Sequence, residues 1–397
     1  MTKAMELPIH IRRNGLNPVE ELARAREDEG VVLVETPFGA PAYVICRHED
    51  VRQVLADPAR FSSARTPFPG AEQMSADERA KMQAGQLIGF DPPEHTRLRR
   101  TLTPEFTVRR MRRLEPRIVE IVQAALDDLE RAGKPADLVE HFALPVPSLV
   151  ICELLGVPHG DRAEFHERSV RLLDISLPME QRVAAQREDR AYMSELVARA
   201  QADPGEDLLG MLVREHGHDL STDELVGIAG LLLLAGHETT SNMLGLGTLT
   251  LLRHPEQLAM IREDPAQVEP AVEELLRWMS IVQALPPRTT TTDVKIAGHL
   301  IPEGSLVICS LPAANRDPAF IDDPETLDIS RGAAGHAAFG HGVHHCLGAP
   351  LARMEMRIAF PALLRRFPGL ALADPSEQPN FRATSLVYGV HTLRVTW

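Results

Sequence analysis

Near its C-terminus the chain contains the stretch Phe339-Gly340-His341-Gly342-Val343-His344-His345-Cys346-Leu347-Gly348, which carries its strongest structural signal. A cysteine follows a turn rich in glycine and histidine, and the residues after it, 347–367, predict a helix. A thiolate at a helix start is stabilised by unpaired backbone N–H groups and by the positive end of the helix dipole. Gly340 and Gly342 let the backbone lie flat against a large planar ligand. Together these features suit a soft metal ion, and iron in a haem is the main candidate.

Two other interpretations of this stretch stay open. Zinc could be bound by His341, His344, His345 and Cys346. Zinc sites usually take their ligands from separated pairs, however, and four ligands within six residues would be strained. Cys346 could also be an ordinary buried thiol, but this would leave the glycines and histidines unexplained.

The stretch resembles the haem-binding loop of the cytochrome P-450 monooxygenases. It matches the pattern Phe-Gly-x-Gly-x-(His/Arg)-x-Cys-x-Gly at every fixed position. The resemblance implies that Cys346 is the proximal ligand of the iron of haem b, that His344 bonds a propionate, and that Phe339 and Gly348 contact the cofactor. It also implies a mainly α fold with small β-sheets, in which residues 1–397 form a single haem-binding domain without a fused reductase.

A long helix, Thr222–Arg253, is expected around the segment Ala235-Gly236-His237-Glu238-Thr239-Thr240. Thr239 can bond back to the carbonyl group of Ala235 and open the helix locally. The small residues Ala235 and Gly236 leave room for a diatomic ligand. The segment resembles the P-450 oxygen-activation motif, which implies that Thr239 hydrogen-bonds O2 and that Glu238 relays protons as a general acid. The alternative is an unremarkable surface glutamate beside a helix-interior threonine.

Four charged or imidazole side chains are candidates for holding the haem propionates. Buried carboxylates need paired cations. His95 and Arg99 are four residues apart on one expected helix face, and Arg288 opens an expected strand. By resemblance these three residues and His344 bind the propionates. Taken singly, each could equally be a solvated charge.

A further pair, Glu274 and Arg277, is spaced at i, i+3 on an expected helix. It resembles the Glu-x-x-Arg motif of the family, and by resemblance Arg331 is its partner. A planar guanidinium can bond both oxygens of Glu274 at once. We therefore expect a structural role behind the cysteine loop.

Helical periodicity dominates from residue 94 to about residue 275, with short strands elsewhere. Asn17-Pro18 predicts the start of a helix that runs to about residue 29. A long irregular loop with one short helix is expected over residues 62–89. The expected strands are residues 31–35, 42–47, 294–296, 306–309 and, as an edge strand, 392–397.

Composition excludes several classes of protein. The net charge of −14 argues against a nucleic-acid or anionic-membrane binder. The longest strongly apolar stretch, residues 228–236, is too short to span a bilayer, and no signal peptide is expected. The four cysteines lack C-x-x-C spacing, so that neither a disulfide framework nor a c-type haem is indicated and a cytoplasmic protein is expected. They are Cys46, Cys152, Cys309 and Cys346.

An arginine-rich segment between residues 97 and 113 stands out against this acidic background. Its only acid is Glu105, and its candidate partner-binding residues are Arg97, Arg100, Arg109, Arg110, Arg112 and Arg113. Charge steering would speed encounter with an acidic partner. By resemblance that partner is a ferredoxin, reduced by an NAD(P)H-dependent reductase; otherwise the segment is a solvated face.

The predicted activity is insertion of one oxygen atom of O2 into a C–H or C=C bond of a hydrophobic small molecule, such as a macrolide, polyketide, terpenoid or steroid. The predicted pocket is mostly apolar, with Gln283 as a polar candidate for orienting the substrate. Besides that glutamine it comprises Phe68, Leu87, Ile88, the region 172–179, Leu232, Val282, Leu285, Leu386 and Val387. A haem-thiolate sensor or electron carrier without oxygenase activity and a zinc-binding structural protein are the alternatives.

Overall fold

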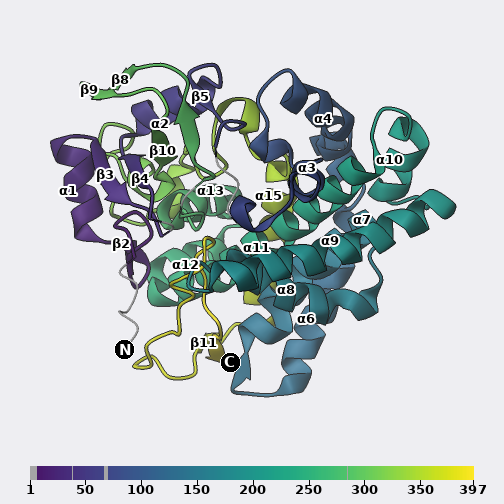
Figure 1. Ribbon diagram of the computed structural model, residues 1–397. Helices are drawn as coiled ribbons and strands as arrows, with labels where there is room; N and C mark the ends of the chain where they lie inside the picture. Colours follow the sequence, from purple (N-terminus) through teal and green to yellow (C-terminus); the bar gives the residue numbers. More distant parts are fainter. Residues whose placement is uncertain (1–6, 38, 67–69, 284) are drawn as a thin grey trace.

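The computed structural model describes residues 7–37, 39–66, 70–283 and 285–397 as a mainly helical protein with small β-sheets, as the sequence predicts (Figure 1). The helices are α1 (Glu20–Asp28), α2 (His48–Ala56), α3 (Ala76–Gln83), α4 (Glu94–Leu102), α5 (Val108–Met111), α6 (Glu115–Ala132), α7 (Pro145–Leu155), α8 (Arg162–Leu173), α9 (Met179–Ala202), α10 (Leu208–His216), α11 (Thr222–Arg253), α12 (Pro255–Glu263), α13 (Val268–Met279), α14 (Leu311–Ala314) and α15 (Ala349–Arg366). The strands are β1 (Arg13–Asn14), β2 (Asn17–Pro18), β3 (Val31–Glu35), β4 (Pro41–Ile45), β5 (Phe61–Ser62), β6 (Ala136–Asp137), β7 (Arg288–Thr290), β8 (Val294–Ile296), β9 (His299–Ile301), β10 (Leu306–Cys309), β11 (Ala371–Leu372) and β12 (Arg394–Thr396).

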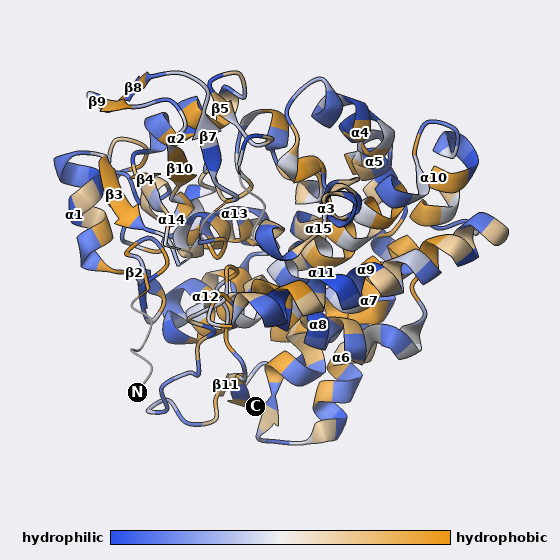
Figure 2. Ribbon diagram, in the orientation of Figure 1, coloured by the Kyte–Doolittle hydropathy of each residue, from blue (hydrophilic) through white to orange (hydrophobic). Residues whose placement is uncertain are grey.

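Helix α11, 32 residues long, runs through the middle of the molecule (Figure 1). A capping box starts it: the Ser221 hydroxyl accepts a hydrogen bond from the Glu224 N–H at 3.2 Å, and the Glu224 carboxylate accepts one from the Ser221 N–H at 2.7 Å. Residues 240–251 are buried on every side. Helices α7, α9 and α15 pack against α11. The burial follows from the many apolar residues of this helix, which are orange in Figure 2.

The largest sheet has the strand order β3-β4-β10-β7-β5. Its β4 and β10 are parallel, with Ala42 opposite Leu306, and β7 is antiparallel to both β10 and β5. This sheet joins the N-terminal part of the chain to residues near the cysteine loop. It carries Arg288, which begins β7 and is buried.

Buried apolar residues form one large cluster that joins α6, α7, α11, α13 and α15. Two smaller clusters lie against the five-stranded sheet. Burial of apolar surface on this scale is the main term that stabilises a fold. Among the described helices, none is both long and apolar enough to cross a membrane.

Two predictions about local structure are wrong. The predicted N-cap at Asn17 is instead in β2, which pairs with β1 across Gly15, and α1 begins only at Glu20. The predicted edge strand near the C-terminus, β12, is the central strand of the sheet β11-β12-β6. The first error arises because Asn17 pairs with Asn14, three positions earlier, across a glycine turn that competes with a helix start at the same residues. The second arises because β12 pairs with β6, which is far away in the sequence and is not revealed by local sequence.

Candidate haem site

The cysteine loop is shaped by its two glycines. Gly340 and Gly342 have φ angles of 71° and 70°, in the left-handed region that favours glycine. A side chain is also excluded by space at the second position, because a Cβ on Gly342 would lie 2.3 Å from the carbonyl oxygen of Leu55. The Cys346 N–H donates to the Phe339 carbonyl oxygen at 2.9 Å and closes the loop. The backbone therefore holds the cysteine in one place.

Cys346 is exposed, whereas Cys46, Cys152 and Cys309 are buried, and none of these four cysteines forms a disulfide bond. Burial raises the pKa of the Cys346 thiol, and the backbone N–H groups of Gly348 and Ala349, at the start of α15, partly offset this increase. A thiol that is surrounded by protein and still exposed lies in a recess. A Cβ on Gly348 would lie 4.0 Å from the sulfur, so that glycine keeps the space beside Sγ open.

The centre of α11 is open on one side. Ala235 is exposed and its neighbours Leu234, Gly236 and Thr239 are partly exposed, although the helix beyond them is buried. The Thr239 hydroxyl donates to the carbonyl oxygen of Ala235 at 2.8 Å, which confirms the predicted bond within the helix. This opening exposes the threonine and the alanine of the motif together.

Glycine is required at position 236 for a packing reason. A Cβ at this position would lie 2.7 Å from Cδ1 of Ile151 on α7. Glycine is therefore required for the close packing of α11 on α7. The sequence predicted instead that its small size leaves room for a diatomic ligand, but the missing side chain would point to Ile151.

The four predicted propionate ligands include a close pair of imidazoles. The rings of His95 and His344 have centroids 4.3 Å apart. Both ring nitrogens of His95 and Nδ1 of His344 are buried without a hydrogen-bond partner among the described residues. Arg288 is buried, and Arg99 donates through Nη2 to the carbonyl oxygen of His345 at 2.7 Å.

Electrostatics show that these four side chains lie together. Burial, Arg288, His95 and Arg99 lower the pKa of His344 to about 3. Burial, Arg99 and Arg288 likewise lower the pKa of His95. Among the described residues, neither Arg99 nor Arg288 has an ion-pair partner. The charge of Asp91 acts on His95 and Arg288, but Asp91 forms no ion pair with either. No carboxylate of the described residues is thus bound directly by this donor set, and the two carboxylates of a haem match it in charge and hydrogen-bonding capacity.

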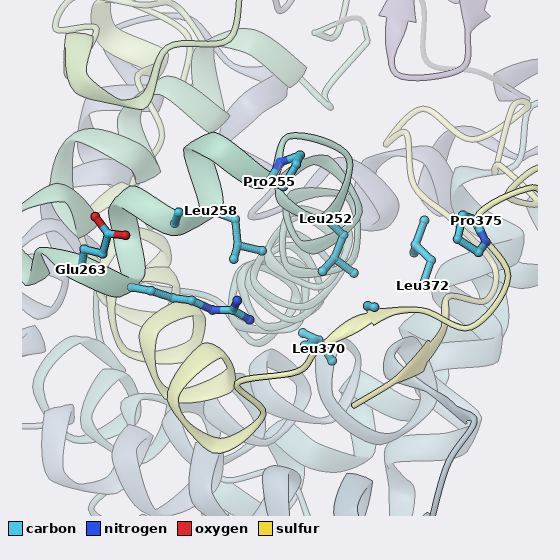
Figure 3. Close-up of a pocket in the computed structure, with 10 residues that line it drawn as sticks. Leu252, Pro255, Leu258, Glu263, Leu370, Leu372 and Pro375 are labelled. Carbon is cyan, nitrogen blue, oxygen red and sulfur yellow. The ribbon is translucent and has the colours of Figure 1, made fainter.

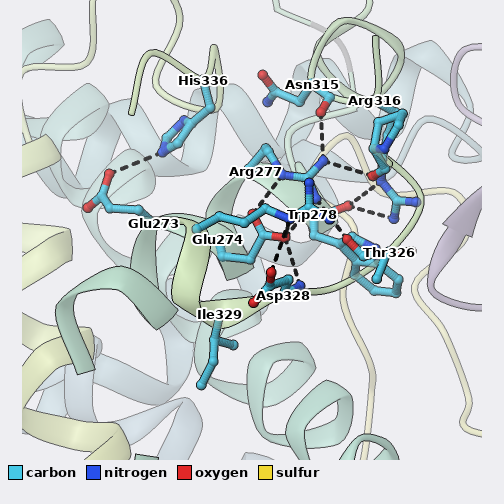
Figure 4. A network of polar contacts seen from close by, with 12 residues as sticks. Glu273, Glu274, Arg277, Trp278, Asn315, Arg316, Thr326, Asp328, Ile329 and His336 are labelled. Atoms are coloured by element: carbon cyan, nitrogen blue, oxygen red, sulfur yellow. Dashed lines mark hydrogen bonds and ion pairs between the residues drawn. The ribbon is translucent and has the colours of Figure 1, made fainter. Parts of the chain in front are cut away.

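Glu274 and Arg277 form a fully buried pair on α13 (Figure 4). Arg277 donates from Nε and Nη2 to the two carboxylate oxygens at 2.7 Å each. The Asp328 N–H donates to Oε1 at 3.1 Å, and Nε of Arg331 lies 3.8 Å from the same oxygen. Arg277 therefore supplies the two-pronged contact, while Arg331, the predicted partner, is a more distant third member.

Glu273, beside this pair, connects α13 to the cysteine loop. Arg353 on α15 donates to its two oxygens at 2.7 and 2.8 Å, and His336 contacts it at 3.2 Å. Burial alone would raise the pKa of Glu273, but Arg353 and His336 lower it to about 2. The Arg353 guanidinium also lies 4.5 Å from the ring centre of Phe339. This link could not be predicted from the sequence, because no regular spacing relates these residues.

Glu238 is buried, with 1% of its surface exposed. Its Oε2 accepts a hydrogen bond from Arg382 at 2.8 Å and a longer one from Asn242 at 3.4 Å. Burial alone would raise the pKa of Glu238, but His237 and Arg382 lower it to about 2. The residue is thus an ionised carboxylate at neutral pH. Arg382 was not predicted, because it comes from a C-terminal segment without a motif.

Several predicted pocket residues share one apolar region. Val282 pairs with Val387 in a β-bridge, and the N–H of Leu386 donates to the carbonyl oxygen of Leu173 at 3.0 Å. The large apolar cluster includes Leu87, Leu232 and Val387, with Val282 packed against it. Leu285 packs against the apolar cluster of the sheet, and Ile88 is 40% exposed. Phe68 lies outside the described residues.

Gln283 is a correction to the predicted pocket. It is fully buried, its Oε1 accepts from Nε of Arg13 at 3.2 Å, and its Nε2 donates to the carbonyl oxygen of Ser385 at 2.9 Å. Both ends of the amide are therefore occupied by the chain itself. The structure gives Gln283 a structural role, joining the N-terminal segment to the C-terminal one, and not the role of orienting a substrate.

The arginine-rich segment divides into two groups. Arg97 pairs with Glu94 and Glu224, and Arg110 pairs with Glu105 at 2.8 Å. The other four arginines are exposed and have no ion pair within the described ranges: Arg100, Arg109, Arg112 and Arg113. The candidate partner surface is therefore smaller than predicted.

An open groove of about 490 Å³ lies elsewhere (Figure 3). Its lining comes from the end of α11, from α12 and from the segment around β11, including Leu252, Pro255, Leu258 and Leu372. No predicted site residue lines it. We therefore do not assign it to the haem site.

Comparisons with known proteins agree with this site. A family model described as Cytochrome P450 matches residues 9–181 and 179–394. The chain is 57% identical over 400 residues to Cytochrome P450 FAS1 of Rhodococcoides fascians, covering all of both chains, and 44% identical to the Vitamin D3 dihydroxylase of Streptomyces griseolus, covering 94% of this chain and 93% of that protein. The solved structure of P450 StaH from glycopeptide antibiotic A47934 biosynthesis superposes with a TM-score of 0.87 at 46% identity, covering 99% of this chain and 100% of that one. The chain therefore belongs to the cytochrome P450 family of monooxygenases.

Proposed function

We propose that the protein binds haem b and uses O2 to insert one oxygen atom into a C–H or C=C bond of a hydrophobic small molecule. One observation carries the proposal: an exposed cysteine just before α15 is accompanied by four cationic or imidazole side chains to which no carboxylate of the described residues is bound directly. The residues involved are His95, Arg99, Arg288 and His344. Because they span residues 95 to 346, we also propose that they belong to a single haem-binding domain.

Each residue has a part that its surroundings support. The Cys346 thiolate would bind the iron, with the N–H groups of Gly348 and Ala349 stabilising its charge. The buried donors of His95 and His344, together with the two arginines, would hold the propionates. When bound, the haem supplies the chemistry that activates O2.

Thr239 and Glu238, both on α11, would deliver protons during the reaction. The Thr239 hydroxyl can rotate away from the Ala235 carbonyl oxygen and form a hydrogen bond with a water molecule or with O2 instead. Glu238 is ionised, so that it must first accept a proton before it can pass one on. Its predicted general-acid role therefore becomes the role of a two-step relay.

The proposed substrate class rests on the apolar lining and on the relatives. One relative is named for vitamin D3 and a similar structure for glycopeptide antibiotic biosynthesis. The apolar region that Val282, Leu386 and Val387 help to form is compatible with a macrolide, polyketide, terpenoid or steroid. None of the four cysteines forms a disulfide bond, which is compatible with a reducing compartment such as the cytoplasm.

Electrons would come from an acidic ferredoxin and its NAD(P)H-dependent reductase. The exposed arginines Arg100, Arg109, Arg112 and Arg113 suit an acidic partner because opposite charges steer the encounter. Replacing Arg109 and Arg113 with glutamate should then slow reduction at low salt, and added salt should shrink the difference.

The decisive experiment is a carbon monoxide difference spectrum of the reduced protein. Wild type should give a thiolate-type band, which Cys346→Ala should lose; the buried Cys309→Ala is the matched control and should retain it. A thiolate-type band in Cys346→Ala would overturn the assignment. Substrate-dependent NADPH consumption with surrogate redox proteins then separates an oxygenase from a sensor or electron carrier, and metal analysis tests for zinc in the cysteine loop.

A further inference from the structure

Three side chains that commonly bind metals converge on the face of α11 that packs against α8. They are His166 on α8 and the neighbours His237 and Glu238 on α11. His237 and Glu238 are buried and His166 is partly exposed. We propose that these three side chains form a binding site for a divalent metal ion, and that Zn²⁺ fits it best.

The distances among the three ligand atoms match a metal site. Nδ1 of His166 lies 2.9 Å from Nε2 of His237, and Oε1 of Glu238 lies 3.4 Å from the latter nitrogen and 3.6 Å from the former. An ion about 0.7 Å out of the plane of these atoms would be about 2.05 Å from each, which is the usual bond length and the tetrahedral height for zinc. The ligands need little movement to bind it.

The proton of His237 is on the nitrogen that faces away from the site. The Ser148 hydroxyl donates to the carbonyl oxygen of Leu144 at 2.7 Å and lies 2.8 Å from Nδ1 of His237. Since the hydroxyl has only one proton, Nδ1 donates to it. In the neutral ring, which is the form that binds a metal, Nε2 then presents a lone pair, and the hydrogen bond to Ser148 fixes the ring as in known metal sites.

Glu238 provides an independent observation. Arg382 and Asn242 occupy its Oε2, whereas Oε1 is buried and accepts no hydrogen bond from the part of the chain that the structure describes. A hydrogen bond between the two imidazoles would explain their 2.9 Å contact, but it would leave this oxygen without a donor. A metal ion would satisfy all three atoms at once.

The ligand set and its surroundings favour zinc. Two imidazoles and one carboxylate are a set that zinc accepts with a fourth position open to water. A cavity of about 60 Å³ adjoins His166 and Glu238, which is enough room for a water molecule. Arg382 repels a dication, so we expect moderate affinity.

This site would regulate the proposed oxygenase. A metal bound to Oε1 would occupy the one oxygen of Glu238 that no other described group contacts by a hydrogen bond, and turnover would fall. That consequence rests on the proposed function, whereas metal binding itself does not.

The test is a calorimetric titration with Zn²⁺ alone. The sample is the haem-loaded ferric protein after treatment with a chelator. Wild type should bind one equivalent. His166→Ala should weaken binding by at least about tenfold, since one of three ligands is lost. His391→Ala is the matched control: His391 lines the same cavity but is not a ligand, and its loss should leave the affinity unchanged. Equal affinities of wild type and His166→Ala, or no binding by wild type, would overturn the proposal.

Zinc-edge X-ray absorption of the wild-type complex gives a second measurement that does not depend on a variant folding. Two imidazole nitrogens and one carboxylate oxygen bound to the zinc, with a water as the fourth ligand, support the site, and any other set of protein ligands contradicts it. Neither measurement involves turnover. A protein that binds zinc at His166 without oxygenating any substrate would therefore refute the proposed function and leave this site standing.

Discussion

The polar networks around Glu274 and around Glu238 are alike in composition and opposite in completeness. Each centres on a buried glutamate of a helix that faces an arginine. Both oxygens of Glu274 are occupied, by Arg277 and by the Asp328 N–H (Figure 4). Only one oxygen of Glu238 is occupied. A completed network fixes structure, whereas an open one keeps an atom available for a proton or a ligand.

A third buried glutamate, Glu355 on α15, extends the comparison. Its Oε2 has no hydrogen-bond partner within the described residues, and burial raises its pKa well above the ordinary value. With no cation beside it, this side chain is neutral when folded. The three glutamates therefore range from fully paired, through half paired, to unpaired.

The largest effect should come from breaking the complete network. Arg277→Leu leaves the Glu274 carboxylate buried without its cation, and we expect a loss of about 3–5 kcal/mol in the free energy of unfolding. Arg331→Leu is the matched control: this arginine lies 3.8 Å from Glu274 and should cost about 1 kcal/mol or less. Urea denaturation of the haem-loaded proteins measures both. Equal losses would show that the two arginines share the charge.

On the open side, substitution should affect rate more than stability. Thr239→Ala should lower product formation by about 100-fold or more, because the hydroxyl that positions a proton is lost. Thr248→Ala provides the control, since Thr248 donates to the carbonyl oxygen of Leu244 at 2.8 Å in the same helix, as Thr239 does to Ala235. Product formation and NADPH consumption should be measured together. Similar activities of the two variants would remove Thr239 from the mechanism.

Glu238, the half-paired glutamate, should make the free energy of unfolding depend on pH in the acidic range. The folded-state pKa of Glu238 is lowered to about 2, so that its stabilising contribution is complete above the ordinary pKa of a glutamate and is lost as the pH falls towards 2. Glu238→Gln should remove this part of the pH dependence, at most about 3 kcal/mol. Denaturation of both proteins between pH 3 and pH 7 tests it. Parallel curves would mean that Glu238 is not held as an anion.

The unpaired glutamate should give the smallest effect, with the opposite sign. Because burial raises the folded-state pKa of Glu355, stability falls as the pH rises above the ordinary pKa of an unfolded glutamate. Glu355→Gln should therefore raise the free energy of unfolding at pH 7 and leave it nearly unchanged near pH 4. Chemical denaturation at the two pH values is the measurement. A destabilised variant at pH 7 would show that the carboxylate has a cationic partner.

Local sequence predicted those features that depend on neighbours in the chain. The left-handed glycines of the cysteine loop, the bond from Thr239 to Ala235 and the long helix α11 follow from residue types and spacing of one to five positions. The central place of β12 could not be predicted, because its partner β6 is far away in the sequence. Asn17 is an exception: its strand partner Asn14 is only three positions away, and the prediction was wrong because a glycine turn and a helix start are alternatives for the same short stretch.

By itself the sequence determined the family, the candidate metal-binding cysteine and the candidate clamps, since these depend on motifs whose residues are close together. Only the tertiary structure decided which buried polar groups find a hydrogen-bond or ion-pair partner. Arg382 forms an ion pair with Glu238 across 144 positions of sequence, and His166 contacts His237 across 71 positions. The side chain of Gln283 accepts a hydrogen bond from Arg13, near the other end of the chain. Burial and pairing set the protonation of these groups, and both are properties of packing between distant segments.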